Sequence, residues 1–164
     1  MNFLAHIYLS GGDLGLIIGN YIGDDIKGNQ WKDIDADIAR GVLMHRQIDY
    51  FTDSHPVCLE VAKHLRPYFG KWSAVAIDLY WDHFLASSWA DHHDTPLEKF
   101  SSEIYALLKE NKSSLTPQSR KMLQHMSQYD WLTSYASLEG IGSAFNGLSR
   151  RISIANTLHR GNEV

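Results

Sequence analysis

The sequence has little cysteine, little proline and no excess of positive charge, and these shortages narrow the class of protein. One cysteine, Cys58, excludes an internal disulfide, and it is expected to pack as a small apolar residue. Nineteen acidic residues against fifteen basic ones give a formal net charge of −4 at pH 7, which argues against a general affinity for nucleic acid. With 44% apolar and 21% charged residues, the composition is that of a soluble globular protein.

Long hydrophobic runs are also absent. The longest apolar stretches fall far below the length that spans a membrane, so no membrane association is expected. The first residues, 1–6, lack the basic region of a secretory signal peptide, and we therefore expect a cytoplasmic protein. A chain of 164 residues without internal repeats or a dividing linker predicts a single domain over residues 1–164.

The four prolines divide the chain into segments, and Pro56, Pro96 and Pro117 each suit the first turn of a helix. Between these marks apolar residues recur with helical spacing, and the alternation typical of strands is absent. The pattern predicts helices over residues 14–26, 34–52, 57–68, 73–89, 97–111 and 117–127, and a helical tail after Trp131 that is broken at Gly140, Gly142 and Gly147. We therefore predict an all-α fold.

One row of polar residues follows a predicted helix through apolar surroundings. His45, Asp49 and Asp53 fall within about 80° of one face at 3.6 residues per turn. Each has an ordinary interpretation, because His45 could be a satisfied core histidine, Asp49 could pair with Arg46, and Asp53 could cap the next helix. One cap does not explain the whole row, and acidic side chains are rarely buried unless they are paired or bind a metal. The row therefore favours a metal site.

A second row lies on the helix predicted over residues 73–89. Asp78 and Asp82 are one turn apart, with His83 beside them, and aromatic neighbours make a solvated face a poor explanation. We therefore expect the two rows to face one shared cavity, lined by His45, Asp49, Asp82 and His83.

The ligand types indicate which ion such a cavity would bind. Carboxylate oxygens with one or two imidazoles suit Mn²⁺ or Mg²⁺, and Fe²⁺ is an alternative. A structural zinc site would need cysteines that the chain lacks. A bound ion of this kind activates water and polarises a phosphoryl oxygen, so the pattern points to metal-dependent phosphoryl chemistry.

Three further groups carry weaker signals. Asp24 and Asp25 lie near the end of a predicted helix, where an exposed pair and a ligand pair are equally good interpretations. His6 belongs to no pattern that assigns it a role. Arg150 and Arg151 could hold a phosphate, because paired guanidinium groups match phosphate geometry.

Five segments between Met1 and Arg151 combine these residues into longer motifs. They are Met1-Asn2-Phe3-Leu4-Ala5-His6, Gly19-Asn20 through Asp24 to Lys27-Gly28, Met44-His45-Arg46-Gln47-Ile48-Asp49 with Thr52-Asp53, Trp81-Asp82-His83-Phe84-Leu85, and Leu138 through Asn146-Gly147 to Arg150-Arg151. Together, and in this order, they resemble the acyl carrier protein phosphodiesterase family.

The resemblance implies a compact all-α domain like that of the HD-domain phosphohydrolases. It also implies that Mn²⁺ supports hydrolysis of the phosphodiester between 4′-phosphopantetheine and a serine of holo-acyl carrier protein. By position, the candidates for metal binding are His6, Asp24, His45, Asp49, Asp53, Asp78, Asp82 and His83. The candidates for catalysis are His45, Asp49, Asp82 and His83, and the sequence does not separate a ligand from the general acid. The candidates for contacts with phosphate or carrier are Arg46, Arg150 and Arg151.

Family members continue past the paired arginines through a further helix rich in aromatic residues, so we expect a domain shortened at its C-terminus. Two other functions stay open at this point. One is an HD-type phosphohydrolase acting on a nucleotide or another small phosphodiester, and the other is a non-enzymatic homologue that binds a metal or the carrier.

Docking of an acidic carrier on a net-negative protein requires a local positive surface. The candidates are cations in or beside the family-like segments, namely Lys27, Arg40, Arg46, Arg150 and Arg151.

Overall fold

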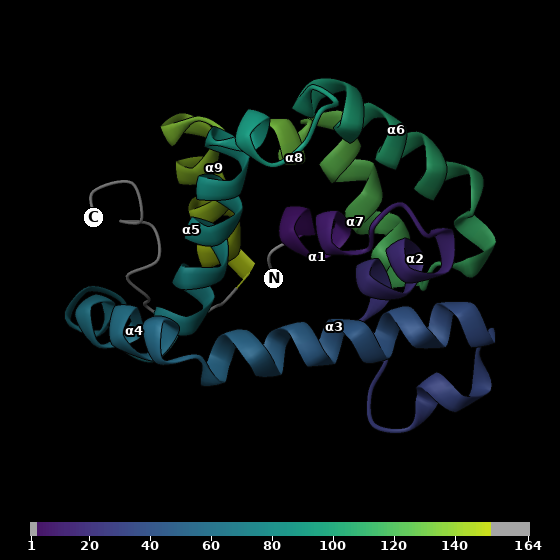
Figure 1. Ribbon diagram of the computed structural model, residues 1–164, viewed down its shortest axis with the longest axis horizontal. Helices are drawn as coiled ribbons and strands as arrows, with labels where there is room; N and C mark the ends of the chain where they lie inside the picture. The colour runs from purple at the N-terminus through teal and green to yellow at the C-terminus, as the bar shows by residue number, and fades with distance from the viewer. Residues whose placement is uncertain (1–2, 152–164) are drawn as a thin grey trace.

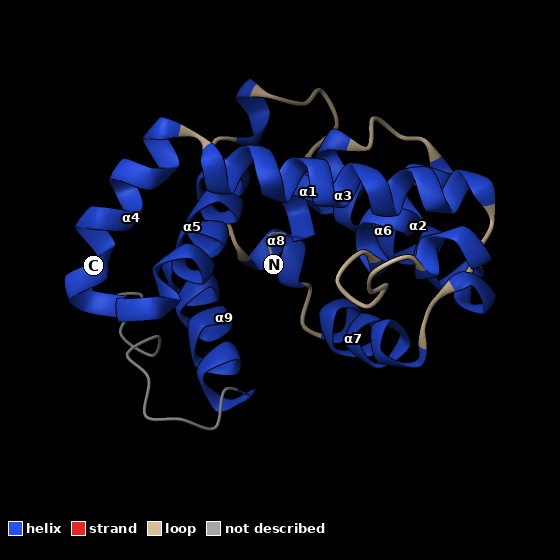
Figure 2. Ribbon diagram, turned by 90° about the horizontal axis from the view of Figure 1, so that it is seen from below, coloured by secondary structure: helices blue, strands red, loops and turns tan. Residues whose placement is uncertain are grey.

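The computed structural model describes residues 3–151, and of Arg150 and Arg151 the backbone alone. Within this range no strand is present (Figure 2), so the predicted all-α fold is confirmed. The helices are α1 (Phe3–Leu9), α2 (Leu14–Ile22), α3 (Ala36–Ser54), α4 (Pro56–Phe69), α5 (Ser73–Ser87), α6 (Leu97–Glu110), α7 (Pro117–Gln128), α8 (Trp131–Ser134) and α9 (Leu138–Arg151). Short 3₁₀ turns lie at η1 (Gln30–Asp33), η2 (Gly70–Trp72), η3 (Trp89–Asp91) and η4 (Lys112–Ser114).

Side-chain caps set where two of the helices that build the site begin. The Asp13 carboxylate accepts a hydrogen bond of 2.9 Å from the N–H of Leu16 at the start of α2. Asp35 accepts bonds from the N–H groups of Asp37 and Ile38 at the start of α3. Because an N-cap residue lies outside the helix, α3 begins after Asp35 rather than at residue 34.

Near the N-terminus the structure corrects the sequence analysis twice. The periodicity does not predict α1, because seven residues are too few to show a helical period. The helix predicted over residues 14–26 ends at Ile22, where Gly23 caps it. Asp24 and Asp25 therefore lie beyond the helix rather than in its last turn.

The predicted breaks near the C-terminus are wrong, because α9 runs through Gly140, Gly142 and Gly147 without interruption. A β-carbon at Gly140 would lie 1.8 Å from the carbonyl oxygen of Ser134, so α9 approaches α8 more closely than any larger residue would allow. Close packing of this kind offsets the low helix propensity of glycine.

The helices form one compact domain (Figure 1). The long helix α3 runs along one edge and α2 packs on it, whereas α1 packs against α2 and α5, and α9 packs against α5. One apolar core joins them, and members that are at most 1% exposed include Leu4, Val42, Phe69, Leu108 and Phe145, which come from five different helices. None of the described helices has both the length and the apolar character needed to cross a membrane.

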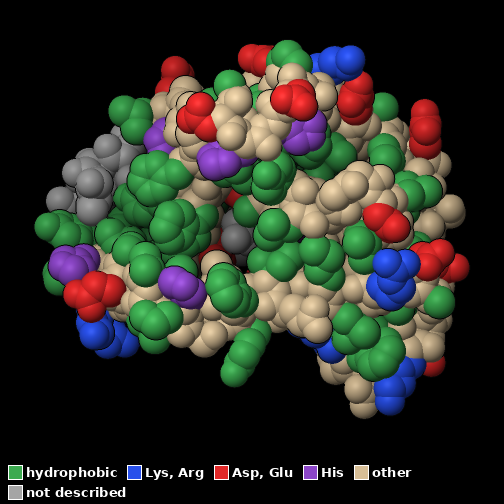
Figure 3. All heavy atoms as spheres, viewed as in Figure 1, with side chains coloured by type: hydrophobic (Ala, Val, Ile, Leu, Met, Phe, Trp, Pro, Cys, Tyr) green, Lys and Arg blue, Asp and Glu red, His purple; other side chains and the backbone are tan. Residues whose placement is uncertain are grey.

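The helix α4 lies at the edge of the domain and buries only two residues, Leu65 and Phe69, in its described contacts. Hydrophobic side chains gather on the surface over α4 and α5 (Figure 3), where Val57, Tyr68 and Phe84 are each more than half exposed.

The most extensive contact between helices joins α2 to α3 and positions the site described below. A β-carbon at Gly19 would lie 2.2 Å from the carbonyl oxygen of Ile38 and 2.5 Å from the Cα of Gly41. Only glycine at both positions lets the two backbones meet at this distance. The crossing places the end of α2, with Asn20 and Gly23, against the middle of α3.

We predict that Gly19→Ala lowers the free energy of unfolding by about 1–3 kcal/mol, because the added methyl group meets backbone that cannot move aside. Gly147→Ala is the matched control, since its β-carbon meets nothing within 4 Å. This change should stabilise the protein by about 0.5–1 kcal/mol through helix propensity. Urea unfolding followed by circular dichroism measures both, and equal effects of the two substitutions would contradict the account of the crossing.

Candidate metal centre

Side chains from two helices and one turn converge at the α2–α3 crossing. His6 comes from α1, His45 and Asp49 come from α3, and one ligand atom of each lies within 4.8 Å of the others. Asp49 accepts from both imidazoles, with 3.1 Å from Oδ1 to His6 Nε2 and 3.2 Å from Oδ2 to His45 Nε2. Asp24, in the turn after α2, lies 3.6 Å from His45 Nε2. We call these four residues the His–Asp cluster.

A chain of hydrogen bonds fixes which nitrogen of His6 faces the cluster. The Ser10 hydroxyl donates to the His6 carbonyl oxygen at 2.9 Å, so its oxygen accepts the bond from Asn20 Nδ2. The amide of Asn20 therefore turns its Oδ1 toward His6 Nδ1, 3.0 Å away. Because Oδ1 is an acceptor only, Nδ1 carries a proton. Nε2 therefore faces Asp49, to which it donates while it is protonated, and it presents its lone pair to the cluster only when His6 is neutral.

His45 is held in place by close packing. Its ring stacks on that of His6 with centroids 4.2 Å apart, and a β-carbon at Gly23 would lie 2.3 Å from the His45 Cγ. Its Nδ1 is buried without a hydrogen-bond partner among residues 3–151, whereas Nε2 faces Asp24 and Asp49. The ring thus presents one nitrogen to the two carboxylates and the other to the protein interior.

The electrostatics couple these groups strongly. Burial disfavours a charged His45, but the bonds and charges of Asp24 and Asp49 outweigh it and raise its pKa to about 9. Burial also opposes ionisation of Asp49, yet the bonds from His45 and His6 hold the pKa of its carboxyl well below the usual value. The bond to His45 is the main cause that lowers the pKa of Asp24. At neutral pH and without a metal, a cationic His45 therefore lies between two carboxylates.

The donor set fits a divalent metal ion. Two imidazole nitrogens and one or two carboxylate oxygens converge. Asn20 also holds His6 Nδ1 in a hydrogen bond, and bonds of this kind orient histidine ligands in metal sites. A space of about 10 Å³ lies among His6, Asn20, Asp24 and His45, which is roughly the size of one small ion or water. The side chains of Asp24 and Asp49 are 58% and 43% exposed, so a substrate can reach this side of the cluster.

The structure places the second predicted row apart from this cluster. Asp82 is fully buried and accepts hydrogen bonds from the N–H groups of Leu4 at 3.1 Å and Ala5 at 2.9 Å. Burial raises the pKa of Asp82 to about 7, against the lowering effect of these two bonds. Asp82 thus anchors the first turn of α1, the helix that carries His6, and its role as a ligand stays a prediction.

The remaining candidates of the second row lie along α5 and at the end of α3. His83 Nδ1 lies 2.7 Å from the carbonyl oxygen of Tyr135, to which it donates. Asp53 and Asp78 line a cavity of about 220 Å³ between α3, α4 and α5. Burial, and then the charges of Asp78 and Asp49, raise the pKa of Asp53. Asp82 and His83 therefore face the backbone of α1 and of Tyr135, and neither belongs to the group that His45 and Asp49 form with His6.

The two carboxylates after α2 have different partners, and so does Arg46, one of the basic residues predicted to contact phosphate or carrier. Asp25 accepts from the hydroxyls of Thr116 and Ser119 and so ties the turn to the start of α7, whereas Asp24 faces His45. Arg46 donates to the carbonyl oxygen of Ile26 at 2.8 Å. The side chains of the two predicted phosphate contacts in α9 lie outside the described part, and they are those of Arg150 and Arg151.

Sequence reasoning missed Ser10, Asn20 and Gly23. The available signal was Asn20, a polar residue inside the apolar run from Ile17 to Ile22, because a buried amide requires hydrogen-bond partners. Nothing local marks Gly23 as the surface on which the His45 ring rests.

Comparison with known proteins agrees with the sequence motifs. The family model for acyl carrier protein phosphodiesterase matches residues 1–164. The chain belongs to this family. Proteins named acyl carrier protein phosphodiesterase from Escherichia coli O6:H1 and from Klebsiella pneumoniae (strain 342) are each 31% identical to it over 156 residues, which is 92% of this chain and 79% of theirs. No solved structure matches the chain, and its likeness to the HD-domain architecture stays a prediction.

The neighbouring carboxylates Asp24 and Asp25 offer a matched pair of substitutions. We predict that Asp24→Asn weakens Mn²⁺ binding by about tenfold or more, because a charge beside His45 is lost. Asp25→Asn should leave the dissociation constant within about twofold, yet lower stability by about 1–3 kcal/mol through its bonds to Thr116 and Ser119. Titration calorimetry and urea unfolding separate the two effects. Equal metal affinities in the two variants would exclude Asp24 from the centre.

Proposed function

We propose that the protein is a metal-dependent phosphodiesterase that hydrolyses 4′-phosphopantetheine from the serine of holo-acyl carrier protein. Membership of the acyl carrier protein phosphodiesterase family supports the reaction and the substrate. The convergence of His6, His45 and Asp49 is the observation that carries the metal dependence.

In this proposal Nε2 of His6, Nε2 of His45 and the carboxylate of Asp49 hold the ion, with Asp24 beside them. Mn²⁺ is the proposed ion. Fe²⁺ suits the same oxygen and nitrogen donors, whereas Mg²⁺ suits a site with fewer imidazoles. A bound divalent ion supplies positive charge for the phosphoryl oxygens and lowers the pKa of a coordinated water.

The chain's own residues position the metal ligands. Asn20 keeps the lone pair of His6 Nε2 directed at the centre, and Asp82 keeps α1 in place through two backbone hydrogen bonds. His45 is engaged by two carboxylates, and His83 faces the Tyr135 carbonyl rather than the cluster, so neither histidine is assigned as the proton donor to the leaving serine oxygen.

Two of the cations predicted to dock the carrier are already engaged within the chain. Arg40 pairs with Asp37 at 3.2 Å and Arg46 is committed to the Ile26 carbonyl, so both already have partners within the chain. Lys27 is exposed and is the remaining candidate whose side chain is described. Docking is therefore proposed to depend on Lys27 together with the two arginines that end α9.

The high pKa of His45 makes metal binding dependent on pH. His45 is protonated below about pH 9 in the metal-free protein, and a histidine ligand must be neutral. Binding of Mn²⁺ therefore releases a proton, and we predict that the affinity rises about tenfold per pH unit between pH 6.5 and 8.5. Calorimetry in two buffers of different ionisation enthalpy counts the proton. An affinity that is flat over this range would contradict ligation by His45.

Activity is tested by incubating holo-acyl carrier protein with the metal-depleted protein and added Mn²⁺. We expect the mass of the carrier to fall by that of the phosphopantetheine group, and chelator to stop the reaction. Asp49→Asn should lower the rate by about 100-fold or more, because it removes a charged ligand shared by two imidazoles. Asp37→Asn, an exposed change on the same helix, is the matched control. A carrier of unchanged mass, or an active Asp49→Asn variant, would refute the proposal.

A further inference from the structure

A second cavity lies between α5, α8 and α9, and no residue of the His–Asp cluster lines it. Its volume is about 450 Å³, within the roughly 300–1,000 Å³ typical of small-molecule sites. Its lining comes from α5, α8 and α9 and from the segments that join them, and it includes Leu79, Tyr129, Trp131, Ser143 and Leu148.

The cavity exists because of the small residues of α9. Gly140, Ser143, Ala144 and Gly147 recur at helical spacing along the face that lines it, and a β-carbon at Gly147 would meet nothing within 4 Å. Larger residues on this face would fill the space. At the α8 end, the tight contact between Gly140 and Ser134 closes the cavity.

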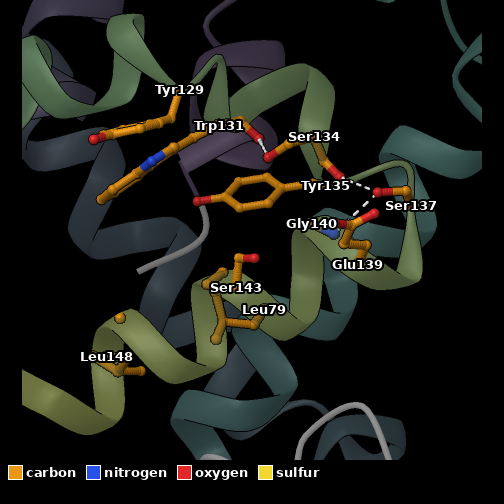
Figure 4. A pocket seen from close by; sticks show the side chains of 12 residues that line it. Leu79, Tyr129, Trp131, Ser134, Tyr135, Ser137, Glu139, Gly140, Ser143 and Leu148 are labelled. Atoms are coloured by element: carbon orange, nitrogen blue, oxygen red, sulfur yellow. Dashed lines mark hydrogen bonds between the residues drawn. The ribbon is translucent and has the colours of Figure 1, made fainter.

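An aromatic wall of the cavity faces a wall of smaller side chains (Figure 4). Trp131 and Tyr135 lie on one side, and Ser143 with Leu79 lies on the other. The Ser134 hydroxyl donates to the Trp131 carbonyl oxygen at 2.9 Å, whereas that of Ser143 has no hydrogen-bond partner among the described residues. The cavity thus combines apolar surface with a few hydroxyl groups, a combination that suits a neutral molecule with amide groups.

The described lining offers no positive charge to an anionic group. Among the lining residues whose side chains are described there is no lysine or arginine, and the one carboxyl group, that of Glu139, is exposed. A phosphate placed here would therefore lack a counter-charge and meet a carboxylate instead. The cavity selects the uncharged part of a ligand whose phosphate lies elsewhere.

The helix α5 connects this cavity to the metal centre. Leu79 lines the cavity, and Asp82, one turn later on α5, holds the first turn of α1, on which His6 lies. His83 is bonded to the carbonyl of Tyr135, in the cavity wall. Leu79 and Asp82 are thus about 4.5 Å apart along the axis of α5.

We propose that this cavity binds the neutral pantetheine arm of the substrate while the phosphate lies at the metal centre. The proposal rests on the proposed function, which supplies the substrate. It assigns recognition of the amide-containing arm to α8 and α9, and hydrolysis to residues of α1 and α3. Free pantetheine, which has no phosphate, should therefore bind to the protein without any metal.

The test uses the full chain and fills the cavity from Gly147. In Gly147→Leu the new side chain enters open space, so the helix should form as before, which circular dichroism and the melting temperature verify. Asn146→Leu adds the same side chain at the exposed neighbouring position and is the matched control. Ser143→Leu, on the cavity face of the same helix, is a second filling variant.

Two measurements decide the outcome. Binding of pantetheine, followed by ligand-observed NMR, should weaken by about tenfold or more in Gly147→Leu, equivalent to about 1.4 kcal/mol, and stay unchanged in Asn146→Leu. The preference for holo-carrier over bis(p-nitrophenyl) phosphate, which lacks the arm, should fall by a similar factor.

Pantetheine binding that is absent in the parent protein, or equal in both filling variants and the parent, would overturn the proposal. Octanoate that binds in place of pantetheine would overturn it too, since the cavity would then select an acyl chain. If the parent protein leaves holo-carrier intact, the proposed function fails, and the binding measurement still decides what the cavity recognises.

Discussion

The close crossing of α2 and α3 is the constraint on which the rest of the site depends. Gly19 and Gly41 let two backbones meet without side chains between them, which brings Asn20, Gly23 and Asp24 against His45. Asn20 then sets the tautomer of His6, which comes from a third helix. A site that needs groups from α1, α2 and α3 within hydrogen-bonding distance is therefore built on the absence of two side chains.

Carboxylates dominate this side of the molecule and oppose one another. Asp49 and Asp78 each raise the pKa of Asp53, and Asp78 adds to the burial that raises the pKa of Asp82. Protonated His45 offsets part of this repulsion in the metal-free protein, because it lies between Asp24 and Asp49. A divalent cation would offset more of this repulsion, so the local charge balance favours metal binding.

The sequence predicted the helical class and the family, and it placed His45 and Asp49 on one face of a helix. These predictions depend on helical periodicity and residue types, which are local properties. It did not predict that Asp82 would anchor α1, since the bonds from Leu4 and Ala5 span more than seventy residues. The different partners of Asp24 and Asp25 depend on where α7 packs, which no local pattern contains. Long-range contacts thus decided which of the candidate residues came together.

The most direct test of the metal centre is a crystal structure of the protein grown with Mn²⁺, with data collected to reveal anomalous scattering. The account predicts a strong anomalous peak bonded to His6 Nε2, His45 Nε2 and the Asp49 carboxylate, at metal–ligand distances of about 2.0–2.3 Å. A peak bound only by Asp53 and Asp78, or two imidazoles that still share Asp49 with no peak between them, would contradict it.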